Sequence, residues 1–137
     1  MGIPASVVEL TTTEKVFIGE PAAQAIASEA ERLGAKRVFL MVSRALNTGT
    51  DEISRIRTAL GARVAGTYDG MPPHAPRSAV LAAAAMARDA NADMIVTVGG
   101  GSITDAGKIV SLCLKHNLRE HDDLEPYHVY VDDKGET

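Results

Sequence analysis

Three consecutive glycines, Gly99, Gly100 and Gly101, are the residues of this sequence best suited to chemistry. They follow the apolar run 94–98, and Ser102 opens a segment of helical pattern behind them. Glycine tolerates tight positive-φ turns and lets a ligand approach the backbone. A helix N-terminus adds unpaired N–H groups and a partial positive charge. Together these features predict a diphosphate site, to which Ser102 can contribute as helix cap and hydroxyl donor.

Two familiar phosphate-binding motifs do not match this loop. A Gly-x-Gly-x-x-Gly fingerprint would need glycine at Thr104, and a Walker A loop would need glycine at Ser102 and Ser or Thr at Ile109. The loop also follows the fourth expected strand, whereas the Rossmann fingerprint follows the first. One alternative stays open, in which the glycines only let strand and helix pack tightly.

The elements around the loop alternate between strand and helix patterns. Short apolar runs predict strands, at 16–18, 38–42, 64–68 and 94–98. Helical spacing predicts helices, at about 22–33, 51–60, 77–90 and 102–116, with a proline-rich loop at 71–76. This order predicts an α/β fold with a mostly parallel sheet flanked by helices.

The end of the chain has a different pattern. Residues 128–131 look like a hairpin strand and 132–135 like its turn, but no returning strand follows. We therefore expect one domain, 1–137, ending in an incomplete hairpin at about 127–137.

Composition excludes several classes of protein. The net charge is −4 with both signs spread along the chain, which argues against a nucleic-acid partner. The longest apolar runs are far shorter than the ~20 residues of a membrane span. Cys113 is the one cysteine, so no disulfide can form within the chain. We expect a cytoplasmic protein.

Three segments resemble the iron-containing (metal-dependent) alcohol dehydrogenases. Residues 92–108 are similar to that family's aspartate, apolar strand, GGGS loop and following Asp and Lys, here Asp105 and Lys108. Residues 15–20 resemble the opening strand, and 63–76 the strand and proline loop. Maleylacetate reductases share this architecture, and a histidine near the end of the proline loop resembles theirs.

The resemblance implies the N-terminal NAD(P)-binding domain of a two-domain enzyme, Rossmann-like and related to the N-terminal domain of dehydroquinate synthase. It implies cofactor contacts from Gly99, Gly100, Gly101, Ser102 and Asp105. A C-terminal helical domain, which we expect to be absent from this chain, would supply Asp and His ligands for a divalent metal, Fe or Zn. We therefore expect no catalytic residue and no metal ligand within the chain.

Departures from the family concern the cofactor. Many members end the second strand with an aspartate that rejects a 2′-phosphate, whereas this chain has Ser43 followed by Arg44. Arg44 can pair with a phosphate, so the pair predicts tolerance of NADP; a solvated loop arginine is the alternative. Many members also carry Asn where Ala75 stands, and His74 can replace that contact.

Three functions remain open from the sequence. The first is an NAD(P)-dependent oxidoreductase that interconverts an alcohol and a carbonyl, metal-assisted in the intact protein. The second is a maleylacetate reductase, and the third is a nucleotide-binding module without activity. The expected partner is a small alcohol, aldehyde or keto acid; a homodimer is also a hypothesis. We interpret His116, His121 and His128 as solvated, and the Asp105–Lys108 spacing also fits a simple ion pair.

Overall fold

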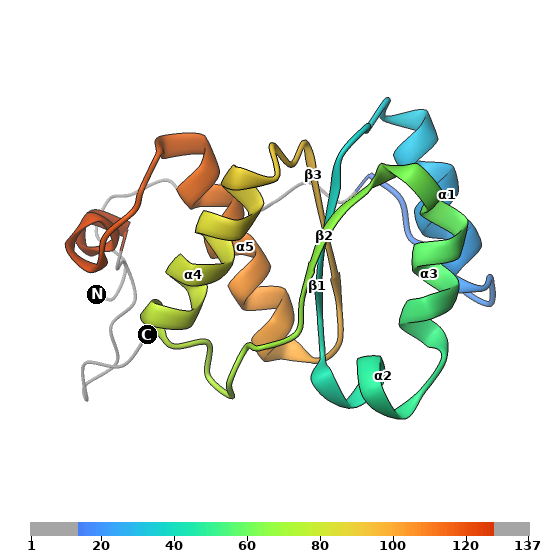
Figure 1. The fold of residues 1–137 in the computed structure, drawn as a ribbon, viewed down its shortest axis with the longest axis horizontal. Helices are drawn as coiled ribbons and strands as arrows, with labels where there is room; N and C mark the ends of the chain where they lie inside the picture. The colour runs from blue at the N-terminus through green and yellow to red at the C-terminus, as the bar shows by residue number, and fades with distance from the viewer. Residues whose placement is uncertain (1–13, 128–137) are drawn as a thin grey trace, which may run out of the picture.

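The computed structural model describes residues 14–127, which form a three-stranded parallel sheet with helices on both faces (Figure 1). The sheet order is β2-β1-β3, with β1 at Val38–Val42, β2 at Val64–Tyr68 and β3 at Met94–Val98. The helices are α1 (Ala22–Arg32), α2 (Arg44–Gly49), α3 (Glu52–Leu60), α4 (Arg77–Asp89) and α5 (Gly101–His116), with 3-10 turns η1 (Gly61–Arg63) and η2 (His121–Tyr127). The predicted α/β class is confirmed.

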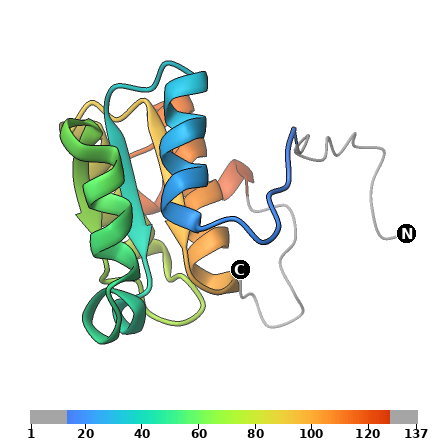
Figure 2. The same ribbon diagram turned by 90° about the vertical axis from the view of Figure 1, so that its right-hand side faces the viewer.

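The central strand β1 is buried along its whole length. Phe39 and Met41 point into a core formed with α4 and α5, while Val38, Leu40 and Val42 point into a second core formed with α1 and α3. This alternation follows from the two-residue period of a strand. Figure 2 shows α1 and α3 side by side over one face of the sheet. The continuous apolar run is therefore explained by helices on both faces, as expected for parallel strands.

The carboxyl ends of the three strands lie at one edge of the sheet, at the bottom of Figure 1 beside α2. The chain leaves β1 through α2 and α3 on one face, and leaves β3 through α5 on the other. Because β1 and β3 are neighbours and their following segments go to opposite faces, this edge of the sheet is a topological switch point. In open α/β sheets this switch point is where ligands bind.

Helix α5 packs unusually close to β3. A Cβ placed on Gly107 would lie 2.3 Å from Cγ2 of Thr97, a distance that real side chains do not reach. Only glycine allows this approach without a shift of one element. The contact fixes the height of α5 above the sheet, and with it the position of the glycine loop that begins the helix.

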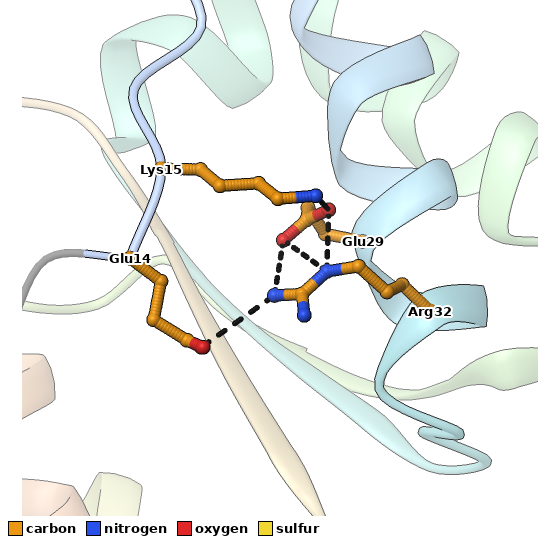
Figure 3. Close-up of polar contacts among 4 residues, drawn as sticks. All are labelled: Glu14, Lys15, Glu29 and Arg32. Carbon is orange, nitrogen blue, oxygen red and sulfur yellow. Dashed lines mark hydrogen bonds and ion pairs between the residues drawn. The ribbon is translucent and has the colours of Figure 1, made fainter.

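The strand predicted at 16–18 is wrong. Val16 and Ile18 are 73% and 91% exposed, and the segment has no strand geometry. The residues before it contact α1 instead: Figure 3 shows Glu14 paired with Arg32 and Lys15 with Glu29. A three-residue apolar run needs a ladder partner to be a strand, and no described strand provides one.

The other predicted elements are confirmed with helix ends displaced by one residue. One short helix, α2, was not predicted. The polar stretch after Asn117 forms η2, whose Leu124 is buried in the core with α4 and α5. The predicted hairpin at 128–137 lies outside the described residues. No helix within 14–127 is long and apolar enough to cross a bilayer.

Candidate cofactor site

Gly99 ends β3 in a conformation that requires glycine. Its φ is +151°, in the region that L side chains rarely adopt. A Cβ here would also lie 3.0 Å from Cγ1 of Ile103 and 3.1 Å from Cβ of Ser43. The amide of Ser43 donates to the carbonyl of Val98 at 2.9 Å, which extends the β1–β3 ladder to this edge. The loops that follow β1 and β3 therefore meet at Gly99.

Gly100 and Gly101 have no such requirement. Both have negative φ, and a Cβ on either would meet no heavy atom within 4 Å. Tight packing of strand on helix, the open alternative from the sequence, accounts for Gly99 and Gly107 but not for these two. Their missing side chains leave the outer face of the loop bare, as expected where a ligand contacts the backbone.

The backbone at this point starts a 16-residue helix. The carbonyl of Gly100 accepts hydrogen bonds from the amides of Ile103 and Thr104, both at 3.2 Å. The amides of Gly101 and Ser102 belong to the first turn, which precedes the first helical carbonyl that could accept from them. Donors and the positive end of the helix dipole thus meet on a face without side chains, which suits a diphosphate.

Ser102 has a different role from the one predicted. The helix begins one residue earlier than expected, so Gly100 is the N-cap, and no side chain caps it. The prediction that Ser102 caps α5 is therefore wrong. Its Oγ instead accepts a hydrogen bond from the amide of His74 at 3.2 Å, which joins the proline loop to the start of α5. The hydroxyl proton of Ser102 remains available to a ligand.

The proline loop holds its own strained turn. His74 and Ala75 have φ of 67° and 46°, an uncommon conformation for two successive residues with side chains. The turn is closed by a hydrogen bond from the amide of Ala75 to the carbonyl of Pro72 at 3.2 Å, and Ala75 itself is buried. His74 is exposed beside Ser102, at the position where the sequence suggested a replacement for the family asparagine.

Ser43 and Arg44 lie at the end of β1, and both already have partners. Ser43 is the N-cap of the unpredicted helix α2, and its Oγ accepts from the amide of Leu46 at 3.2 Å. Serine is a favoured N-cap residue, so Ser43 could have signalled a helix start. The helix is only six residues long, which is too short for a helical pattern to be recognised in the sequence. Arg44 extends toward Asp69, with 3.4 Å between Nη2 and Oδ1. The alternative interpretation, in which Arg44 is only solvated, therefore omits its carboxylate partner.

Asp69 and Asn47 belong to this edge and were missed from the sequence. Asp69 directly follows β2, and its Oδ2 accepts from Nδ2 of Asn47 at 2.9 Å. The pKa of Asp69 is held below its usual range, first by this hydrogen bond and then by the charge of Arg44, against partial desolvation. The signal that could have found Asp69 is its place immediately after a parallel strand, the same argument that selected Ser43.

Asp105 lies one turn into α5 on the side facing away from the core, and it is exposed. Lys108 is exposed too, and the two side chains form no ion pair in the structure of residues 14–127, so the simple i,i+3 pairing is wrong. His116 and His121 are also exposed. Within the described residues no three His, Cys, Asp or Glu side chains gather as metal ligands.

A hollow of about 480 Å³ lies at the opposite edge of the sheet, where the strands begin. Its lining is Gly34, Ala35, Lys36, Leu60, Ala62 and Arg63. It is far from the carboxyl edge, has no glycine loop or helix N-terminus, and opens widely to solvent. We do not regard it as the cofactor site.

Comparison with known proteins gives the family. The profile described as iron-containing alcohol dehydrogenase matches residues 13–135. The chain belongs to this family. Maleylacetate reductase 2 of Cupriavidus pinatubonensis is 37% identical over 105 residues, and 1,3-propanediol dehydrogenase of Klebsiella pneumoniae is 30% identical over 104 residues.

Solved structures agree with this assignment. A putative alcohol dehydrogenase from Ralstonia eutropha aligns over 80% of this chain with a TM-score of 0.66 and 36% identity. Maleylacetate reductase from a Rhizobium species aligns over 82% with a TM-score of 0.67 and 28% identity. The chain spans less than a third of these relatives' length: the alignments cover 28% and 27% of the two curated proteins and 30% and 31% of the two structures.

Proposed function

We propose that this chain is the cofactor-binding part of an NAD(P)-dependent oxidoreductase that interconverts an alcohol and a carbonyl compound. The observation that carries the proposal is the bare glycine face at the start of α5, placed at the switch point between β1 and β3. A relative named as an alcohol dehydrogenase and one named as a 1,3-propanediol dehydrogenase support the reaction class.

The residues present fit the cofactor. The amides of Gly101 and Ser102 would donate to the diphosphate, and the dipole of α5 would stabilise its negative charge. The Ser102 hydroxyl would add a donor, steadied by the His74 amide. When bound, the nicotinamide gives or takes the hydride, and the chain's own role is to hold and orient it. Asp105, exposed one turn along α5, is proposed to contact the nicotinamide end.

We propose that ligands outside residues 14–127 hold a divalent metal, Fe or Zn; the family description names iron. The described residues hold no cluster suited to it, so no step of the proposal passes through a metal. The same proposal includes a small-molecule alcohol, aldehyde or keto acid as substrate and a cytoplasmic location.

Binding of reduced cofactor tests the proposal directly. The chain has no Trp, so the enhanced fluorescence of bound NADH or NADPH can be followed with little protein background. Gly101→Val should weaken binding at least about tenfold, since its side chain fills the face that the diphosphate needs and keeps the phosphate away from amide donors whose hydrogen bonds to a charged group are worth ~1.5–3 kcal/mol each. Gly49→Val is the matched control, because a Cβ on Gly49 also meets nothing and Gly49 belongs to the end of α2 instead of the glycine loop. Equal affinity of Gly101→Val and the parent chain would overturn the proposal.

Reduction of maleylacetate is the second candidate. Several curated relatives carry the name maleylacetate reductase, and His74 stands two residues before Pro76 as in the resemblance noted above. Oxidation of NADH by maleylacetate, compared with simple aldehydes, in the protein encoded by the whole reading frame would separate the two. Faster turnover of aldehydes would reject this candidate.

A further inference from the structure

We propose that Asp69 determines which adenosine ribose the site accepts, by holding Arg44 in an ion pair and so disfavouring a 2′-phosphate. This inference rests on the proposed function and concerns the same site. It makes Asp69 a specificity-determining residue and gives the site a preference for NAD over NADP, the reverse of what Ser43 and Arg44 alone predict, because Arg44 is paired with Asp69.

The position of the pair follows from the strand order. Along the carboxyl edge the sheet presents the glycine loop after β3, then Ser43 and Arg44 after β1, then Asp69 after β2. Neighbouring strands are ~4.8 Å apart. The cofactor's two riboses flank the diphosphate, and the adenosine ribose would extend from the glycine loop toward the loop after β1, where many family members carry the aspartate that rejects a 2′-phosphate. Its 2′ position would then face Ser43, Arg44 and Asp69.

The contacts hold Asp69 as an anion at this point. Arg44 and Asn47 both come from α2, three residues apart, and each bonds a different carboxylate oxygen. Asp69 is 29% exposed and Arg44 69% exposed, so the acid is the fixed partner and the guanidinium the adaptable one. Asp69 therefore stays in place whether or not Arg44 turns toward a ligand.

Charge decides the preference. Arg44 alone would attract a 2′-phosphate, whose charge is close to −2 near neutral pH. Paired with Asp69 its charge is cancelled locally, and the phosphate must compete with the carboxylate for the same guanidinium. A free 2′-hydroxyl has no charge to repel and can donate to a carboxylate oxygen. The same residues thus tolerate NAD and penalise NADP.

The test measures NADPH and NADH affinities of the 137-residue chain by cofactor fluorescence. Asp69→Asn removes the charge and keeps an oxygen for Asn47. It should tighten NADPH binding about tenfold, the effect of one charge a few ångströms away in partly screened surroundings, and change NADH less than about threefold. Asp51→Asn is the matched control, since it removes one exposed carboxylate that pairs with Arg55 and should leave the ratio unchanged.

A second variant keeps the test decisive if Asp69→Asn lowers stability. Arg44→Gln alone should weaken NADPH binding relative to NADH by about tenfold, because it leaves the Asp69 carboxylate unpaired beside the 2′-phosphate. In the Asp69→Asn background it should remove the about tenfold gain. An unchanged ratio in Asp69→Asn, or no loss of NADPH affinity in Arg44→Gln, would overturn the role of Asp69 while cofactor binding itself stands. A parent chain that binds neither cofactor would overturn the proposed function and this inference together.

Discussion

The contact between Gly107 and Thr97 leads to a sharp prediction for the variant Gly107→Ala. The added Cβ would lie 2.3 Å from Cγ2 of Thr97, whereas carbon atoms in contact prefer about 3.5–4.0 Å. The helix, the strand or the Thr97 methyl group must therefore move by more than about 1 Å. Overpacking of this kind costs about 1–3 kcal/mol, and the better helix propensity of alanine returns up to about 1 kcal/mol. We expect a net loss of about 1–2 kcal/mol.

Thermal unfolding followed by circular dichroism measures this loss. For a domain of this size, 1–2 kcal/mol corresponds to a fall in Tm of about 4–8 °C. Thr97→Ser removes the opposing methyl group, so Gly107→Ala should be less damaging in that background. Gly49→Ala, whose Cβ has open space, controls for the general effect of replacing a glycine.

Two results would refute the reasoning about this contact. The first is a Tm of Gly107→Ala at or above that of the parent chain, which would mean that α5 does not lie this close to β3. The second is no recovery of Tm in the Thr97→Ser background, which would mean that the cost arises from another neighbour.

Two further predictions concern the loop and the opposite edge of the sheet. Gly101→Ala should raise Tm by about 2–4 °C, because alanine is favoured over glycine by up to ~1 kcal/mol within a helix and its Cβ meets nothing here. The same variant should weaken NADH binding. A lower Tm would contradict the open space at this loop. Asp93 accepts hydrogen bonds from the amides of Lys36 and Arg37, both at 2.9 Å, which lower its pKa. The stabilisation by Asp93 is therefore present above about pH 4, the ordinary carboxyl pKa, and is lost as pH falls through the lowered pKa. Asp93→Asn should have a lower Tm than the parent chain at pH 7, and its Tm should fall less between pH 5 and pH 2. A pH profile of Tm identical to that of the parent chain would contradict this.

Much of the fold could be predicted because its signals are local. The run 38–42 is apolar throughout since helices cover both faces of β1, and the helices α3 and α5 follow apolar spacing of 3.6 residues. The segment 16–18 has the same apolar character but no partner strand, and sequence alone cannot show whether a partner exists. Its ion pairs to α1 involve Glu14 and Lys15, charged residues whose partners only the folded chain reveals.

The site residues that are adjacent in the sequence could be predicted, and those brought together by folding could not. Gly99, Gly100 and Gly101 stand together in the sequence, so their pattern is visible, although their two distinct roles are not: Gly99 serves the turn, and the other two leave a face open. Asp69 contacts Arg44 and Asn47, which lie more than 20 positions away in the sequence, so their proximity appears only in the folded chain. Helix α2, which carries Arg44 and Asn47, is also too short to show a helical period in the sequence. Ser102 was assigned to the cap because the helix start was placed one residue late.

An amide NMR titration of the isotope-labelled chain with NADH tests the central claim most directly. The account predicts that the largest shifts fall on residues 99–102, with smaller ones at Ser43, Arg44 and His74. Shifts confined to the hollow at the opposite edge, around Lys36 and Arg63, with the glycine amides unmoved, would contradict it.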